Sequence, residues 1–127
     1  MKNLKINSTP KTPEVFFSSK EGELVLTGIS VPEDSLGFYN PLINWLKEYT
    51  NKPAATTSFT FKLAYVNTSS LQALYDILFL LDDINGESSK VIVNWYYLEE
   101  DVDMQEVGED LQEALSINFC FFAVDDV

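Results

Sequence analysis

The change of hydrophobic period across residues 66–71 is the feature that most restricts how this chain can fold. Residues 59–66, Phe-Thr-Phe-Lys-Leu-Ala-Tyr-Val, show the period of two expected of a strand. From Leu71 to Leu81 the apolar residues recur at spacings of three and four, as on one face of a helix. Four small polar residues at 67–70 separate the two patterns. The sequence therefore predicts a strand that passes directly into a helix at this run.

The same two patterns alternate along the rest of the chain. They predict strands at 15–17, 23–29, 59–66, 91–97 and 117–124, and helices at 40–49, 70–83 and 103–115. The first two strands should form an antiparallel hairpin through a turn at Gly22, and strands joined through helices should pair in parallel. We therefore expect an α/β fold with a single mixed β-sheet of about five strands and helices packed on it, in the order β-β-α-β-α-β-α-β.

The length and the two ends of the chain bound its organisation. The 127 residues fit one domain, 1–127. The polar residues 1–13 contain Pro10 and Pro13, and we expect them to form a loose N-terminal arm. No signal-peptide core and no run of about 20 apolar residues is present, and there is a single cysteine. These observations favour a cytoplasmic protein with no membrane contact.

Three local expectations concern helix starts and burial. Asn40 followed by Pro41 predicts an N-cap and the first residue of a helix. The continuous apolar run at 91–97 predicts a central strand covered on both faces. Cys120 lies between two phenylalanines in an apolar strand, which predicts a buried, inert thiol.

Charge and residue usage argue against most enzyme mechanisms. There are 20 acidic and 8 basic residues, a net charge of −12, and no histidine; all eight bases are lysines. Nucleic-acid backbones are bound by clustered Lys and Arg, so we expect no nucleic-acid partner. Histidine is the commonest general base and metal ligand, and arginine supplies the bidentate grip on phosphate. We therefore expect a protein that is not an enzyme and that holds no cofactor.

An acidic run at Glu99–Asp110 carries seven carboxylates in twelve residues. Asp101 and Asp103 begin like a calcium-binding loop, but Gln105 and Glu106 do not continue that pattern. The run therefore favours a solvated loop and helix start over a metal site. Asp103 and Glu106 also have the spacing of a capping box at the start of the last helix.

The polar run at 67–70, Asn-Thr-Ser-Ser, has two interpretations on residue chemistry alone. Such side chains accept hydrogen bonds from the free N–H groups of a helix start, which makes a plain N-cap the commoner outcome. A helix start with free hydroxyls is also a favourable place for a phosphate group. The residues themselves leave both interpretations open.

A set of short stretches, taken together, identifies a family. They are Thr12-Pro13, Gly28, Pro32-Glu33, Phe38-Tyr39-Asn40-Pro41, Trp45-Leu46, Asn67-Thr68-Ser69-Ser70, Trp95-Tyr96-Tyr97 and the acidic run from Asp101 to Asp110. This set resembles the SiaC family of bacterial signalling proteins, from about Thr12 to Phe122. The most specific pieces are the Asn-Thr-Ser-Ser run and the acidic run that ends in Gly-Glu-Asp.

The resemblance implies a fold similar to the STAS domains of anti-sigma-factor antagonists and a role in partner switching. In the family, the threonine that matches Thr68 is phosphorylated by a dedicated kinase and dephosphorylated by a PP2C-type phosphatase. The unphosphorylated form binds and activates a diguanylate cyclase, which raises cyclic-di-GMP and favours biofilm growth. Leu71 and Gln72 depart from the family pattern, which has a serine and a lysine after the run.

Two groups of residues are therefore candidate contact sites for partners. The first comprises the neighbours of Thr68, which we expect to form the surrounding surface and the helix cap: Asn67, Ser69 and Ser70. The second, in the acidic run, is Asp101, Asp103 and Glu106. An alternative function is an acidic decoy that occupies a basic nucleic-acid-binding surface of another protein. A decoy would depend on distributed charge and tolerate Thr68→Ala, whereas a switch would not.

Overall fold

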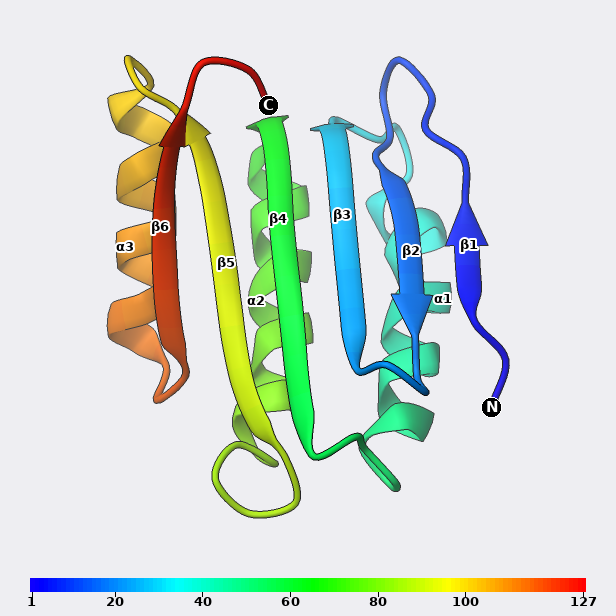
Figure 1. Cartoon of the computed structure of the whole chain (residues 1–127). Coiled ribbons are helices and arrows are strands. Elements are labelled where there is room, and N and C mark those ends of the chain that lie inside the picture. The colour runs from blue at the N-terminus through cyan, green and yellow to red at the C-terminus, as the bar shows by residue number, and fades with distance from the viewer.

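The computed structural model describes residues 1–127, and its strands form one mixed sheet (Figure 1). The sheet has six strands that lie side by side in chain order. They are β1 (Leu4–Ile6), β2 (Glu14–Ser18), β3 (Glu23–Ser30), β4 (Thr56–Val66), β5 (Lys90–Leu98) and β6 (Asn118–Val124). The pairs β1–β2 and β2–β3 are antiparallel, and the remaining pairs are parallel. The predicted α/β class, hairpin and parallel pairing are confirmed, with one strand more than expected.

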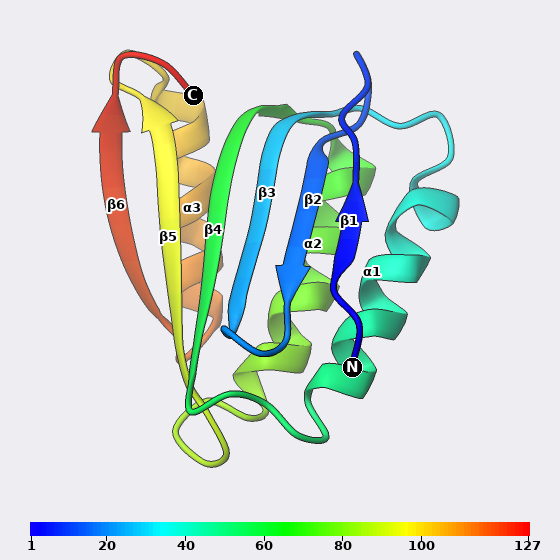
Figure 2. The same ribbon diagram turned by 45° about the vertical axis from the view of Figure 1, so that its right-hand side comes forward.

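Three helices lie on one face of the sheet (Figures 1 and 2). They are α1 (Ser35–Tyr49), α2 (Thr68–Asp82) and α3 (Val102–Ala114). The strands β3 to β6 follow one another in the same direction across the sheet, so right-handed crossovers place every connecting helix on the same side. A cluster of 23 buried hydrophobic residues fills the space between helices and sheet.

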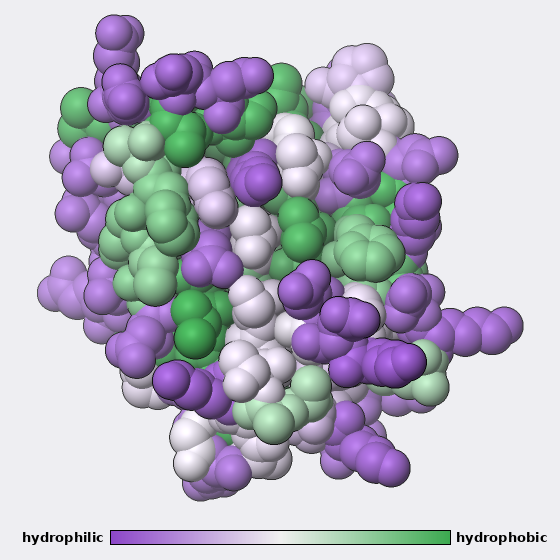
Figure 3. Space-filling view, in the orientation of Figure 1, coloured by the Kyte–Doolittle hydropathy of each residue, from purple (hydrophilic) through white to green (hydrophobic).

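The opposite face of the sheet carries no helix, and Figure 3 shows apolar and polar side chains interspersed on it. The ring of Tyr96 stacks there on Phe122 at a centroid distance of 4.7 Å, and the Lys62 Nζ lies 4.9 Å from the Tyr96 centroid. The expectation that residues 91–97 are covered on both faces is therefore wrong. Cys120 pairs with Asn94 on this open face and is exposed, so the predicted burial of its thiol is also wrong.

The N-terminal segment is more ordered than its composition suggests. Residues 1–13 are not a loose arm, because Leu4–Ile6 pairs with β2 and adds the sixth strand. The Trp45 indole N–H donates to the Lys2 carbonyl oxygen at 2.8 Å, which ties this strand to α1. The alternating Leu4 and Ile6 are half-buried against the core.

The first helix begins at Ser35, six residues before the predicted first helical residue, Pro41. Asp34 is the N-cap, and its carboxylate accepts a hydrogen bond from the Gly37 N–H at 3.0 Å. Pro41 therefore lies inside α1, where it removes one helical hydrogen bond but does not end the helix. The Asp34 cap was missed because the Asn-Pro pair downstream is the stronger sequence signal for a helix start.

The last helix is capped by Asp101, whose carboxylate accepts from the Met104 N–H at 3.0 Å; the predicted cap at Asp103 is wrong. Gly108 faces the sheet in this helix. A Cβ built on Gly108 would lie 2.6 Å from the Trp95 Cδ1 and 2.8 Å from the Phe121 Cε1. The glycine therefore allows α3 to approach the sheet closely enough for the Trp95 indole N–H to donate to the Met104 carbonyl oxygen at 3.0 Å.

Candidate functional site

The parallel direction of β3 to β6 gathers the predicted site residues at one edge of the sheet. The carboxyl ends of β3, β4 and β5 lead into the starts of α1, α2 and α3, at the top of Figure 1. Asn67 follows β4 with extended backbone angles (φ −87°, ψ 173°), and its Oδ1 accepts from the Ser70 N–H at 2.9 Å. Asn67 is thus the N-cap of α2, and the predicted passage from strand to helix is confirmed.

The three hydroxyl residues that follow Asn67 have different surroundings. Thr68 and Ser69 are exposed, whereas Ser70 is fully buried. The Ser69 hydroxyl donates to the Asn67 Oδ1 at 3.2 Å and lies 2.5 Å from the Ser35 hydroxyl of α1. The Thr68 hydroxyl takes part in none of these bonds. Thr68 is therefore the one exposed hydroxyl of the run that is free of intramolecular hydrogen bonds.

The burial of Ser70 corrects the expectation that it belongs to the surface around Thr68. Its hydroxyl donates to the Ser30 carbonyl oxygen at 3.1 Å and accepts from the Ser30 hydroxyl at 2.7 Å. The side chain points inward because it occupies the first turn of α2 on the helix face that packs on the sheet. Ser70 therefore holds the helix start in place and is not accessible to a partner.

A third hydroxyl completes this buried cluster. The Tyr39 hydroxyl of α1 lies 2.6 Å from the Ser30 hydroxyl, and both residues are at most 1% exposed. Burial raises the pKa of the Tyr39 phenol from its ordinary value, and the hydrogen bonds of Ser30 and Ser70 lower that pKa in part. The Tyr39 phenol is therefore neutral at physiological pH and carries a hydrogen that it can donate.

The residues Ser30, Ser35 and Tyr39 were missed as site residues from sequence. A usable signal was present at Ser30, because it continues the even-numbered, inward-facing positions of Leu24 and Leu26. A polar side chain at an inward position needs a hydrogen-bond partner, but the sequence does not show which residue supplies it.

A hollow of about 460 Å³ lies between α1 and α2, with Thr68 in its wall. Its other lining residues come from both helices: Ser35, Leu36, Tyr39, Asn40, Ile43, Ser69, Gln72, Ala73 and Asp76. We call this hollow the α1–α2 groove. Leu36 is 74% exposed and leaves an apolar side chain uncovered beside the groove. Asp76 is the only charged residue in the lining, so the groove offers no cation to a phosphate on Thr68.

The acidic run lies on the other side of the same edge. Asp101 and Asp103 line a hollow of about 120 Å³ together with Tyr65 and Val66, the residues just before Asn67. The structure thus brings these two carboxylates close to the strand end that leads into Thr68. Glu106 is exposed further along α3 and does not line this hollow.

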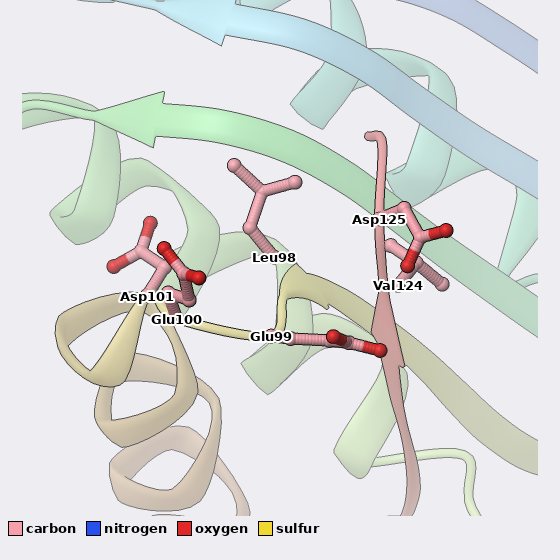
Figure 4. A pocket seen from close by; sticks show the side chains of 6 residues that line it. All are labelled: Leu98, Glu99, Glu100, Asp101, Val124 and Asp125. Atoms are coloured by element: carbon pink, nitrogen blue, oxygen red, sulfur yellow. The ribbon is translucent and has the colours of Figure 1, made fainter.

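A wider hollow of about 600 Å³ opens between the end of β5 and the segment that follows β6. Figure 4 shows the carboxylates of Glu100 and Asp101 at the start of α3 and those of Glu99 and Asp125 nearer to β6. No basic residue lines this hollow. No group of three carboxylates or thiols in the chain is arranged to hold a metal ion. None of α1, α2 and α3 has the length and apolar character that a membrane span requires.

Comparisons with known proteins agree on one family. The model of the SiaC family regulatory phosphoprotein matches residues 6–124. An uncharacterized protein of Pseudomonas aeruginosa strain UCBPP-PA14 is 29% identical over 126 residues, which cover 99% of this chain and 100% of that protein.

Two solved structures show the same fold. The crystal structure of apo-SiaC from Pseudomonas aeruginosa is 30% identical, with a TM-score of 0.87, and covers 97% of this chain and 100% of its own. The crystal structure of the diguanylate cyclase SiaD in complex with its activator SiaC, from the same species, gives a TM-score of 0.88 at 30% identity over 95% of this chain and 99% of that chain.

Proposed function

Because this chain belongs to the SiaC family of regulatory phosphoproteins, we propose that phosphorylation of Thr68 controls its binding to an output protein. The observation that carries the proposal is the position of Thr68: it is exposed, free of intramolecular hydrogen bonds, and placed at a helix start in the wall of the α1–α2 groove. Ser69 is tied to two neighbours and Ser70 is buried, so neither presents an equally free hydroxyl.

The output protein, in this proposal, binds over the α1–α2 groove when Thr68 carries no phosphate. Phosphorylation adds about −1.5 to −2 charges and three acceptor oxygens at the groove wall. No lysine lines the groove, and Asp76 is already negative there. The phosphate would therefore remain hydrated and exposed, and it would oppose the burial of this surface under a partner. It changes the contact surface and leaves the fold as it is.

The likeness to a complex between SiaD and its activator SiaC supports a diguanylate cyclase as the output protein of this chain. The kinase and the PP2C-type phosphatase that add and remove the phosphate are separate chains, and this protein acts by binding and not by catalysis. Asp101 and Asp103, beside the strand end that leads into Thr68, form a second contact surface for a partner.

The test compares the affinity of four forms for a diguanylate cyclase of the same organism: wild type, Thr68→Asp, Thr68→Ala and Ser88→Asp. Ser88 is exposed in the turn between α2 and β5, at the opposite edge of the sheet, so Ser88→Asp adds the same charge away from the groove. We expect Thr68→Asp to weaken binding at least about tenfold, because an unpaired charge in a contact surface is costly to desolvate. Thr68→Ala and Ser88→Asp should bind like the wild type, but Thr68→Ala should resist the kinase and so lose the switch.

Mass spectrometry of protein purified from its own cells is a second test. We expect it to detect a phosphopeptide in which the phosphate is assigned to Thr68. Equal affinity of wild type and Thr68→Asp, with both folded, would reject the switch. Equal strengthening of binding by Thr68→Asp and Ser88→Asp would instead support attraction through distributed negative charge, as expected of an acidic decoy on a basic surface.

A further inference from the structure

The buried hydroxyls of Tyr39, Ser30 and Ser70 form a hydrogen-bond chain with a single direction. A hydroxyl has one hydrogen to donate. Ser70 uses its hydrogen on the Ser30 carbonyl oxygen, and Ser30 uses its own on the Ser70 oxygen. The bond between Tyr39 and Ser30 must therefore be donated by Tyr39. Tyr39 is the first donor of the chain, and every buried side-chain polar atom in it is satisfied.

This hydrogen-bond chain holds the backbone on both sides of Thr68. The Ser30 carbonyl oxygen accepts from the Ser70 hydroxyl and also from the Asn67 main-chain N–H, at 3.0 Å. Asn67 precedes Thr68 and Ser70 follows it by two residues, so one carbonyl group anchors the turn at both ends. The Thr68 side chain makes no bond of its own, which leaves its direction to this anchor.

We propose that Tyr39 is a positioning residue for Thr68: its buried hydroxyl, acting through Ser30 and Ser70, fixes the turn that presents Thr68 to the kinase and to the output protein. The inference rests on the proposed function of Thr68. It differs from a direct contact, because Tyr39 is 1% exposed and its hydroxyl points to Ser30. Tyr39 lines the α1–α2 groove, but the group that Tyr39→Phe removes is the hydroxyl bonded to Ser30, and the aromatic ring is retained.

The chain provides a matched control in the same helix. Tyr49, near the end of α1, is also fully buried, and its hydroxyl lies 2.7 Å from the Thr57 hydroxyl. Thr57 in turn lies 2.7 Å from the Ser89 hydroxyl, at the edge of the sheet opposite to Thr68. The Tyr49 hydroxyl also accepts from the Ala54 main-chain N–H at 3.1 Å, so Tyr49→Phe removes the same buried group as Tyr39→Phe and one hydrogen bond more.

The experiment uses the full chain and has two readouts. The first is amide hydrogen exchange at Ser70 and Leu71, the two N–H groups held by Asn67 in the first turn of α2. The second is the fraction of protein phosphorylated on Thr68 after expression in its own cells. Tyr39→Phe should speed exchange at these amides and lower the phosphorylated fraction, each by about two- to tenfold, the factor that corresponds to one hydrogen bond.

Tyr49→Phe should lower the thermal midpoint at least as much as Tyr39→Phe does but change neither readout. Equal exchange rates and equal phosphorylation in the two variants would overturn the positioning role. If the wild type carries no phosphate on Thr68, the proposed function fails. The exchange readout still decides the positioning role in that case. Exchange that Tyr39→Phe leaves unchanged overturns this role, and faster exchange supports it.

A double substitution tests whether Tyr39 acts through Ser30. Ser30→Ala removes the hydroxyl that joins Tyr39 to Ser70, so Tyr39→Phe should have no further effect on exchange at Ser70 in the Ser30→Ala background. Additive effects of the two substitutions would show that Tyr39 does not act through the Ser30 hydroxyl, and they would overturn the proposed hydrogen-bond chain.

Discussion

Ser30 and Ser70, 40 residues apart in the chain, are joined by two hydrogen bonds: hydroxyl to hydroxyl at 2.7 Å, and the Ser70 hydroxyl to the Ser30 carbonyl oxygen at 3.1 Å. The contact exists because Ser30 pairs with Val66 at the carboxyl ends of two parallel strands. This contact divides the Asn-Thr-Ser-Ser run into residues with different structural roles. Asn67 caps the helix, Ser70 binds inward, and Thr68 remains free at the surface.

This division predicts unequal stability effects along the run. Asn67→Ala removes the cap of α2 and should lower the free energy of unfolding by about 1 kcal/mol. Thr68→Ala should change it by less than about 0.5 kcal/mol, as for an exposed side chain without partners. Urea unfolding followed by circular dichroism measures both values.

Asp101→Ala serves as the control for the cap, because Asp101 holds the Met104 N–H of α3 in the same geometry as Asn67 holds the Ser70 N–H. It should cost about as much as Asn67→Ala. A larger loss for Thr68→Ala than for Asn67→Ala would mean that the Thr68 hydroxyl is engaged in the native protein, contrary to the structure.

The effect of Gly108→Ala on the free energy of unfolding should be opposite in sign to the effect that helix propensity predicts. Alanine in a helix interior is favoured over glycine by about 1 kcal/mol, so propensity alone predicts that Gly108→Ala stabilises the protein. The added Cβ would instead meet the Trp95 indole at 2.6 Å and the Phe121 ring at 2.8 Å. We expect Gly108→Ala to lower the free energy of unfolding by about 1–3 kcal/mol through overpacking.

Chemical unfolding with tryptophan fluorescence measures this loss and reports the displaced indole. Glu109→Ala, at the next and exposed position of α3, is the control and should stay within about 0.5 kcal/mol of the wild type. A stabilised Gly108→Ala variant would show that α3 moves away from the sheet without cost.

The sequence predicted the parts of this fold that depend on local periodicity. The alternation in 59–66 and the helical spacing after Leu71 are local, and both elements appear where expected. The face that each strand turns to the helices is set by the sheet as a whole. A run such as 91–97 is apolar on both sides, so its pattern cannot show that one side has no cover.

The candidate site was predictable to the level of Thr68 and its helix start, and not beyond. Asn67, Thr68 and Ser69 have the local positions that their spacing implies, but the inward direction of Ser70 depends on Ser30, which lies 40 residues away. Tyr39 enters the site from a third element, and no pattern within α1 distinguishes it from Tyr49 at the other end of the helix. Such long-range partners become visible only when the strands are placed in register.

Cys120 provides a direct test of the open sheet face. Its thiol is exposed on β6 opposite Asn94, and it is the only cysteine of the chain. A thiol reagent such as Ellman's reagent should therefore label the native protein at a rate similar to that of the protein unfolded in urea. Labelling that is much slower in the native state would mean that this face is covered in solution, for instance by a second molecule.

The buried Tyr39 hydroxyl predicts how stability depends on pH at the alkaline end. Burial raises the pKa of Tyr39 above its ordinary value of 10.0, so the unfolded chain loses this proton at a lower pH than the folded protein. The stabilising contribution of the neutral phenol is thus complete below pH 10 and is lost as the pH rises through the folded-state pKa.

Tyr39→Phe has no proton to lose at this position. The measurement is the free energy of unfolding of wild type minus that of Tyr39→Phe, from pH 8 to pH 11, with both proteins titrated in the same buffers. The difference should remain constant up to about pH 10 and then decline. A difference that stays constant across the whole range would show that the Tyr39 phenol ionises equally in both states, and it would contradict the burial of this phenol.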